Sequence, residues 1–253
     1  MRITVFLARL ALIGAVVVSF TEPAAAGEVR AAVASNFTQV AKLLAKGFEG
    51  TTGNRLVLSF GSTGKLYTQI VQGAPFDVFL AADAKRPERL VREGKADPNS
   101  LRTYAVGTLV LWSPKADLID REGTVLNAGS FARIAMANPK TAPYGVAAEE
   151  TLRKMGVLDA LRPKIVQGDN IGQTFQFVMT GNVDLGLVAG SQAIQQKSGS
   201  RWMVPESLHS PLVQKVVMLS GAGNKIASRA FLDYLRSMES RKLIESFGYR
   251  TND

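Results

Sequence analysis

The stretch LSFGSTGKLY, residues 58–67, has the pattern of a buried strand that runs through a small Gly/Ser/Thr turn into a helix. This layout is typical of loops that hold phosphate groups. A nucleotide-binding loop needs G-x-x-x-x-G-K-[ST], but Ser59 stands at the first glycine and Leu66 at the final hydroxyl residue. A nucleotide site is therefore disfavoured. What remains is a helix start whose backbone N–H groups and small hydroxyls suit an anion.

The same alternation of strand and helix continues on both sides of this stretch. Hydrophobic spacing predicts strands at 28–33, 55–60, 76–81, 104–112, 133–137, 165–167, 184–188 and 213–219, with helices in most of the intervals and at the C-terminus. This order predicts an α/β fold with mainly parallel sheets. No proline-rich linker separates the two halves, and the strand at 104–112 is long enough to join two sheets. We therefore expect a hinge between domain I, residues 27–107 and 213–253, and domain II, residues 108–212.

The first 26 residues have the features of a secretory signal peptide. Arg2 and Arg9 precede an apolar run at 10–20, and an A-x-A site follows at 24–26. The run is shorter than a membrane span, although a retained anchor is the alternative. We expect export to the periplasm and a mature chain that begins near Gly27.

Composition excludes several functional classes. The chain has no cysteine, so disulfides, thiolate metal sites and cysteine nucleophiles are absent. Without Arg2, Arg9 and Glu22, 28 basic and 20 acidic residues remain, a formal charge of +8. No run of five or more Lys and Arg occurs, and mixed charge of this kind favours a solvated surface over a nucleic-acid partner. Such a surface can still draw a small anion inward.

An enzyme is also disfavoured. His209 is the only histidine, and Ser191 lies in AGSQA, which lacks both glycines of G-x-S-x-G. A serine–histidine triad would have to use His209, and the sequence has no cluster of histidine and carboxylates for a metal.

Four predicted strand-to-helix junctions carry small hydroxyl or amide residues, at 34–36, 61–64, 138–145 and 168–172. Ligands of open α/β sheets bind beyond the carboxyl ends of strands. Two junctions fall in each predicted domain, so the four could close on one ligand. Taken singly, they have simpler interpretations. Ser35, Asn36, Ser62 and Thr63 could be ordinary helix caps, Tyr144 a turn aromatic on the rim, and Ile171 an apolar first-turn residue that offers only its N–H.

At these junctions the sequence resembles a known family, the periplasmic molybdate-binding proteins of ABC importers, which have the type II solute-binding fold. The resemblance covers almost the whole mature chain and is most specific at GAPFDVFLAAD, residues 73–83, and NPKTAPYG, residues 138–145. Other matching segments lie at 32–49, 58–72, 168–178, 184–193 and 231–249. The resemblance implies two domains with a cleft between them. It also implies a tetrahedral oxyanion held by backbone N–H groups and neutral side chains, without a Lys or Arg salt bridge.

Carried over residue by residue, the resemblance places the oxyanion-binding groups at Ser35, Asn36, Ser62, Thr63, Tyr144 and Ile171. Tyr144 and Ile171 would donate through their backbone N–H groups, and the second-junction hydroxyl falls on Thr63 with Ser62 adjacent. Many members of the family have a tyrosine donor where Ala189 stands here, and Asn36 or the Tyr144 hydroxyl could replace it. Lys65 is expected at the surface or behind the ligand-binding residues, and Asp169 as a helix cap beside the site.

The resemblance thus implies a non-enzymatic, monomeric carrier of molybdate, and of tungstate too, that delivers its ligand to the permease of an ABC importer in the inner membrane. A carrier of sulfate or another tetrahedral oxyanion is the alternative. No cofactor, no nucleic acid and no directly coordinated metal are expected, because molybdenum would be bound as its oxyanion.

Overall fold

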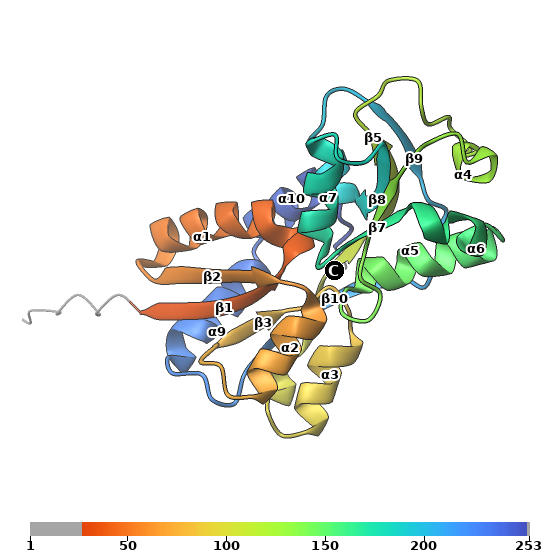
Figure 1. The fold of residues 1–253 in the computed structure, drawn as a ribbon. Helices are drawn as coiled ribbons and strands as arrows, with labels where there is room; N and C mark the ends of the chain where they lie inside the picture. The colour runs from red at the N-terminus through yellow and green to blue at the C-terminus, as the bar shows by residue number, and fades with distance from the viewer. Residues whose placement is uncertain (1–26, 252–253) are drawn as a thin grey trace, which may run out of the picture.

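The computed structural model describes residues 27–251, which form two lobes, each built on a five-stranded sheet (Figure 1). Residues 1–26, which contain the predicted signal peptide, lie outside the described residues. Within the described part of the chain, no helix has both the length and the apolar character needed to cross a bilayer.

The sheet of the first lobe has the strand order β2-β1-β3-β10-β4. β1 runs parallel to β2 and β3, whereas β10 pairs antiparallel with β3 and β4. The strands are β1 Glu28–Ala34, β2 Arg55–Gly61, β3 Val78–Leu80, β4 Arg102–Gly107 and β10 Leu212–Met218.

The sheet of the second lobe repeats this plan in the order β7-β6-β8-β5-β9. β6 runs parallel to β7 and β8, and β5 pairs antiparallel with β8 and β9. The strands are β5 Leu109–Ser113, β6 Ile134–Ala137, β7 Ile165–Gly168, β8 Leu185–Ala189 and β9 Ser200–Met203. The α/β fold is confirmed, and both sheets are mixed. Four strands of each sheet run in one direction, and only β10 in the first sheet and β5 in the second run antiparallel to them.

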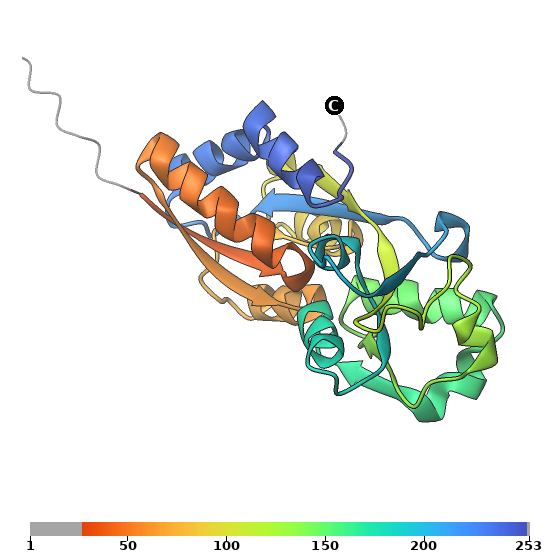
Figure 2. The ribbon, with the colours of Figure 1, turned by 90° about the horizontal axis from the view of Figure 1, so that it is seen from above.

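Helices cover both faces of each sheet, as amphipathic segments must to bury their apolar sides. In the first lobe, α1, α9 and α10 pack on one face around Phe48 and Phe231, and α2 and α3 pack on the other around Leu66 and Leu90. Figure 2 shows α1 beside the C-terminal helices. The helices of this lobe are η1 Ser35–Phe37, α1 Thr38–Thr52, α2 Thr63–Val71, α3 Lys85–Arg92, η2 Pro98–Ser100, α9 Lys225–Leu235 and α10 Met238–Ser246.

In the second lobe, α4, α5 and α6 contribute to one core cluster, and α7 and α8 contribute to the other through residues such as Val178 and Ala193. The helices of this lobe are α4 Val125–Ala128, α5 Pro143–Lys154, α6 Leu158–Leu161, η3 Arg162–Lys164, α7 Ile171–Met179, α8 Gly190–Ala193 and η4 Glu206–Leu208.

Two segments connect the lobes. The strand expected at 104–112 is broken at Thr108, whose carbonyl accepts from the backbone N–H of Gly190 at 2.8 Å. The chain returns between β9 and β10, through η4 and the segment that contains His209. Both connections adjoin the domain boundaries expected from the sequence, and the division into two moving domains stays a prediction.

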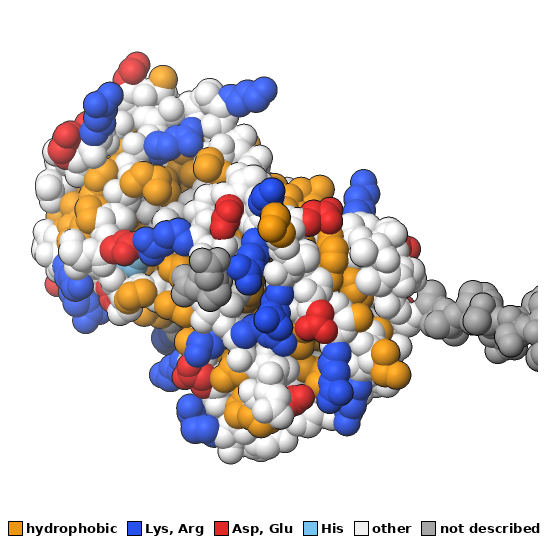
Figure 3. Space-filling model, turned by 180° about the vertical axis from the view of Figure 1, so that it is seen from behind, with side chains coloured by type: hydrophobic (Ala, Val, Ile, Leu, Met, Phe, Trp, Pro, Cys, Tyr) orange, Lys and Arg blue, Asp and Glu red, His pale blue; other side chains and the backbone are white. Residues whose placement is uncertain are grey.

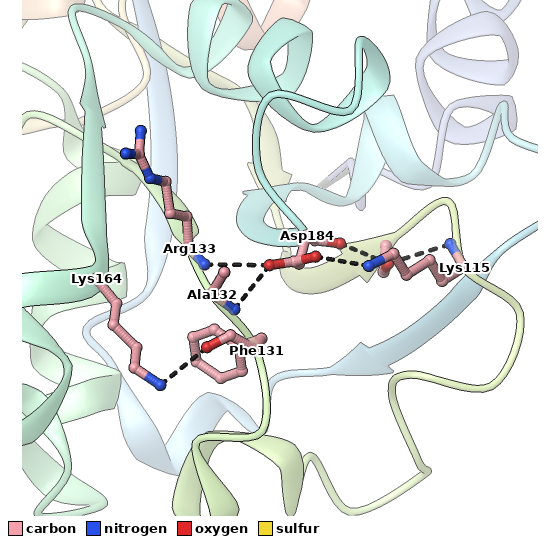
Figure 4. A network of polar contacts seen from close by, with 7 residues as sticks. Lys115, Phe131, Ala132, Arg133, Lys164 and Asp184 are labelled. Atoms are coloured by element: carbon pink, nitrogen blue, oxygen red, sulfur yellow. Dashed lines mark hydrogen bonds and ion pairs between the residues drawn. The ribbon is translucent and has the colours of Figure 1, made fainter.

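A carboxylate network fixes the amino-terminal end of the second sheet (Figure 4). Asp184 precedes β8, and its Oδ2 accepts from the backbone N–H groups of Ala132 at 2.8 Å and Arg133 at 3.1 Å, just before β6. Lys115 Nζ lies 2.6 Å from Oδ1. The hydrogen bond from Lys115 and those from the backbone hold the pKa of Asp184 below its usual range, against a smaller opposing effect of burial. This network is structural, since the carboxyl ends of the strands face the other way.

Candidate functional site

The carboxyl ends of β1 and β2 in one lobe and the helix starts that follow β6 and β7 in the other enclose a small cavity between the lobes. About 180 Å³ between its lining atoms is free of protein, and part of this space is open to solvent. All six residues expected to bind the ligand line it, and each is at most 8 % exposed. The lining residues are Ala34, Ser35, Asn36, Gly61, Ser62, Thr63, Ala82, Ala142, Pro143, Tyr144 and Ile171. The structure therefore brings the four junctions together, and no lining residue carries a formal charge.

The serine and threonine hydroxyls of the cavity are not helix caps. Ser62 occupies the cap position of α2 but makes no side-chain cap hydrogen bond, and its Oγ is buried without any partner. Ser35 precedes Phe37, the cap position of α1, and its Oγ accepts from the backbone N–H of Gly172 at 3.3 Å. Thr63 Oγ1 accepts from the backbone N–H of Ala82 at 3.1 Å. All three hydroxyls therefore keep a proton that they can donate.

Asn36 also has a buried polar atom without a partner. Its Nδ2 donates to Gln214 Oε1 at 2.8 Å and to the Tyr249 hydroxyl at 2.9 Å. Its Oδ1, in contrast, is buried and accepts no hydrogen bond. Buried polar groups are nearly always paired, so Oδ1 lacks a partner, and because an amide oxygen accepts, that partner would be a donor rather than an anion.

Tyr144 is buried in the first turn of α5 and lines the cavity, whereas the simpler interpretation of the sequence had it packing on the cleft rim. Its hydroxyl accepts from Gln214 Nε2 at 3.2 Å. Burial, reinforced by the neighbouring hydroxyls of Tyr249 and Tyr104, raises the pKa of Tyr144 well above its usual value. The phenol therefore stays protonated at neutral pH.

Three helices begin at the cavity and direct their unpaired N–H groups toward it. These are α2 at Thr63, α5 at Pro143 and α7 at Ile171. Pro143 has no N–H, so Tyr144 supplies the first backbone donor of α5. The partial positive charge at each helix start favours an anion. The cavity can thus hold a small anion through neutral donors alone.

The charged residues next to the cavity pair with each other. Lys65 of α2 lies at the surface, and its Nζ is 2.9 Å from Asp169 Oδ2 on the opposite lobe. The sequence suggested Asp169 as the cap of α7, but Asp169 does not have this role. Asn170 has that role, since its Oδ1 accepts from the backbone N–H of Gln173 at 3.0 Å. An asparagine one residue later satisfies the same helix start, which frees the aspartate for the ion pair.

The two walls approach closely beside the cavity. The backbone N–H of Gly64 donates to the carbonyl of Thr141 on the other lobe at 2.8 Å. A Cβ on Gly64 would lie 2.9 Å from that carbonyl oxygen, so a larger residue would force the walls apart. The lobes are therefore closed on the cavity.

A larger groove of about 1280 Å³, open to solvent, adjoins the cavity and shares Ser35 and Asn36 with it. Its other lining side chains include Gln39, Gln176 and Gln195, and none of its lining residues is charged. Sequence reasoning missed this groove. Gln39 lies on α1, Gln176 on α7 and Gln195 in the turn after α8, and nothing in their spacing shows that they meet.

Within residues 27–251, the contacts of Ser191 and His209 do not form a hydrolytic pair. Ser191 Oγ donates to the carbonyl of Asn36 at 3.1 Å and accepts from Tyr249 at 3.0 Å. His209 Nδ1 lies 2.8 Å from the carbonyl of Ser210. Among residues 27–251, no group of three or more His, Asp or Glu side chains could hold a metal ion. On the face shown in Figure 3, basic and acidic side chains are interspersed.

Comparison with known proteins places this site in a family context. Residues 29–250 match the family described as bacterial extracellular solute-binding protein. The chain is 48% identical to the molybdate-binding protein ModA of Rhodobacter capsulatus over 94% of each chain. It is 46% identical to ModA of Azotobacter vinelandii, over 89% of this chain and 91% of that one. The structure of the periplasmic molybdate-binding protein of Azotobacter vinelandii superposes with a TM-score of 0.87 at 38% identity, over 89% of this chain and all of that one.

Proposed function

The chain belongs to the bacterial extracellular solute-binding protein family, whose members are not enzymes, and we propose that it captures molybdate between its lobes and delivers it to the permease of an ABC importer. The similarity to two molybdate-binding proteins at more than 45% identity supports this choice of ligand. We include tungstate, because it is a dianion of nearly the same size and shape. The predicted signal peptide and the family together favour the periplasm as the site of action.

The observation that carries the proposal is the unpartnered hydroxyl of Ser62. It is 3% exposed, lies at the start of α2 and lines the cavity. A buried hydroxyl without a hydrogen bond costs about 1 to 3 kcal/mol, so its retention needs a reason. A dianion in the cavity supplies one, since it would accept from Ser62, Ser35 and Thr63 and from the N–H groups of Tyr144 and Ile171.

The donor set favours molybdate over two commoner oxyanions. Phosphate keeps a proton for much of its population at neutral pH, and no carboxylate lines the cavity to accept that proton. Sulfate has no such proton but is smaller, so its oxygens would lengthen several hydrogen bonds to donors spaced for molybdate. A sulfate carrier remains the competing proposal.

We propose that the two lobes move as domains about the connections at Thr108 and at 204–211. Donors from both lobes must reach one anion, and closing excludes the water that weakens each hydrogen bond. The bonds that join the walls, from Gly64 to Thr141 and from Gly172 to Ser35, would then form as the cleft closes.

Titration calorimetry of the refolded, ligand-free protein with molybdate tests the proposal, with small-angle scattering on the same samples. We expect saturable binding at one site per chain and a smaller radius of gyration with ligand. Absence of binding would refute the proposed ligand. Binding without a change in the radius of gyration would support the proposed ligand and refute the proposed movement of the two lobes.

A further inference from the structure

Gln214 is a polar residue at a place where the strand pattern calls for an apolar one. It lies on β10 between Leu212 and Val216, which face the core, and it is 0% exposed. In the pairing of β10 with β4, Gln214 lies opposite Ala105 and Lys215 lies opposite Thr103, so Tyr104 on β4 is the residue without a partner. Such an irregularity changes side-chain directions locally, and Tyr104 is one of the residues that bond to Gln214. β4 and β10 are also the strands of the first lobe next to the lobe connections.

The carboxamide of Gln214 holds one residue from each wall of the candidate site. Its Oε1 accepts from Asn36 Nδ2 at 2.8 Å and from the Tyr104 hydroxyl at 3.1 Å, both in the first lobe. Its Nε2 donates to the Tyr144 hydroxyl at 3.2 Å, in the second lobe. The bond to Tyr144 therefore crosses between lobes, and rotation of one lobe against the other changes its length.

The backbone leaves room for this junction. A Cβ on Gly107, at the end of β4, would lie 2.1 Å from the Tyr144 hydroxyl and 2.6 Å from Gln214 Nε2. No real side chain tolerates contacts that short, so glycine at 107 is what lets the two groups meet. The contact between Gln214 and Tyr144 therefore depends on the glycine at position 107.

The bond between Asn36 and Gln214 determines which end of the Asn36 amide, Oδ1 or Nδ2, is free to face the ligand. While Gln214 Oε1 holds Asn36 Nδ2, the edge without a partner is Oδ1, an acceptor that repels a dianion. To offer Nδ2 to the anion, the Asn36 amide must turn, and its Oδ1 then faces residue 214. Only an amide at 214 can turn with it and present Nε2 in place of Oε1. A hydrocarbon side chain at position 214 has neither a donor nor an acceptor, and an ionised carboxylate there has only acceptors.

We propose that Gln214 is a positioning residue for oxyanion binding. Its carboxamide determines whether Asn36 presents Nδ2 or Oδ1 to the ligand, and its bond to Tyr144 couples this orientation to the opposite wall of the cavity. The inference rests on the proposed function, since it concerns the same cavity. Gln214 does not line the cavity, so it acts through Asn36 and Tyr144 rather than by touching the anion.

Calorimetry with molybdate on the full-length mature chain tests this with Gln214→Met, Asn36→Ala and the double variant. Gln214→Met should weaken binding about 10- to 150-fold, the range for one hydrogen bond to a charged ligand. If Gln214 acts through Asn36, the double variant should bind no more weakly than the weaker single variant. The matched control is Tyr104→Phe, which also removes a bond to Gln214 Oε1 but leaves those to Asn36 and Tyr144. It should change affinity less than about threefold.

The outcomes separate the inference from the function. If the wild-type protein does not bind molybdate, the proposed function and this inference fail together. If the wild type binds, and Gln214→Met binds as well as Tyr104→Phe or adds fully to Asn36→Ala, the inference is overturned while the function stands. Should Gln214→Met not fold, Gln214→Asn withdraws the amide by one methylene and is expected to show the same loss and the same non-additivity.

Discussion

The Ser62 hydroxyl allows a test in which stability and binding respond differently. Ser62 Oγ has no hydrogen-bond partner in the protein, so Ser62→Ala removes no internal bond. The free energy of unfolding of the ligand-free protein should therefore change by less than about 0.5 kcal/mol, as for a substitution that breaks no internal contact. Binding should respond strongly. A hydrogen bond to a charged ligand contributes about 1.5 to 3 kcal/mol, so the dissociation constant for molybdate should increase about 10- to 150-fold.

Thr63→Val is the matched control, because Thr63 has an internal bond that Ser62 lacks. Thr63 Oγ1 accepts from the buried backbone N–H of Ala82 at 3.1 Å. Its loss leaves that N–H unpaired and should lower the free energy of unfolding by about 1 to 3 kcal/mol, besides weakening binding to a similar extent as Ser62→Ala.

Urea unfolding of the ligand-free variants and calorimetry with molybdate provide the two measurements. If Ser62→Ala bound molybdate within twofold of the wild type, Ser62 would not donate a hydrogen bond to the ligand. If Ser62→Ala lost as much stability as Thr63→Val, Ser62 would have an internal role that its contacts do not show.

Three further outcomes follow from charges and contacts around the site. Lys65→Ala should weaken molybdate binding less than about threefold in calorimetry, because its ion pair with Asp169 is half exposed, and a loss larger than that of Ser62→Ala would indicate a charge clamp. Asp184→Asn should lower the free energy of unfolding in urea by about 1 to 3 kcal/mol at pH 7. Because folding lowers the pKa of Asp184, its stabilisation is present above the unfolded-state pKa of about 4 and is lost as the pH falls below it, so a difference that persisted undiminished at pH 2 would be inconsistent with this role. Gly64→Val should reduce the change in radius of gyration on molybdate binding, because its side chain would meet the Thr141 carbonyl, and full closure would contradict that contact.

The sequence predicts local features well, because strands and their following helices have periodic patterns that short segments reveal. The strand at 55–60 and the helix after the GSTG turn are found at Arg55–Gly61 and Thr63–Val71. The resemblance selected Ser35, Asn36, Ser62, Thr63, Tyr144 and Ile171, and all six line one cavity, although whether each binds the ligand stays a prediction.

Features that depend on distant contacts were not predictable in this way. β9 is a four-residue edge strand, SRWM, too short for a period to be recognised, and the four-residue helix α8 is equally short. Asp169 was taken for a cap because the neighbouring Asn170 is an equally good one. Gln214 meets Asn36, Tyr104 and Tyr144 across 178, 110 and 70 residues of chain. Its one local signal is a polar side chain at an inward position of β10.

Competition binding among four oxyanions tests whether neutral donors in a closed cleft select a fully deprotonated tetrahedral dianion. Ligand-free protein is titrated with molybdate, tungstate, sulfate and phosphate at pH 7 and pH 8. We predict that molybdate and tungstate bind with similar affinity, both far more tightly than sulfate, and that phosphate binds most weakly at both pH values. Phosphate affinity comparable to that of molybdate would contradict the account, because a carboxylate such as Asp169 would then have to enter the cavity and accept the phosphate proton.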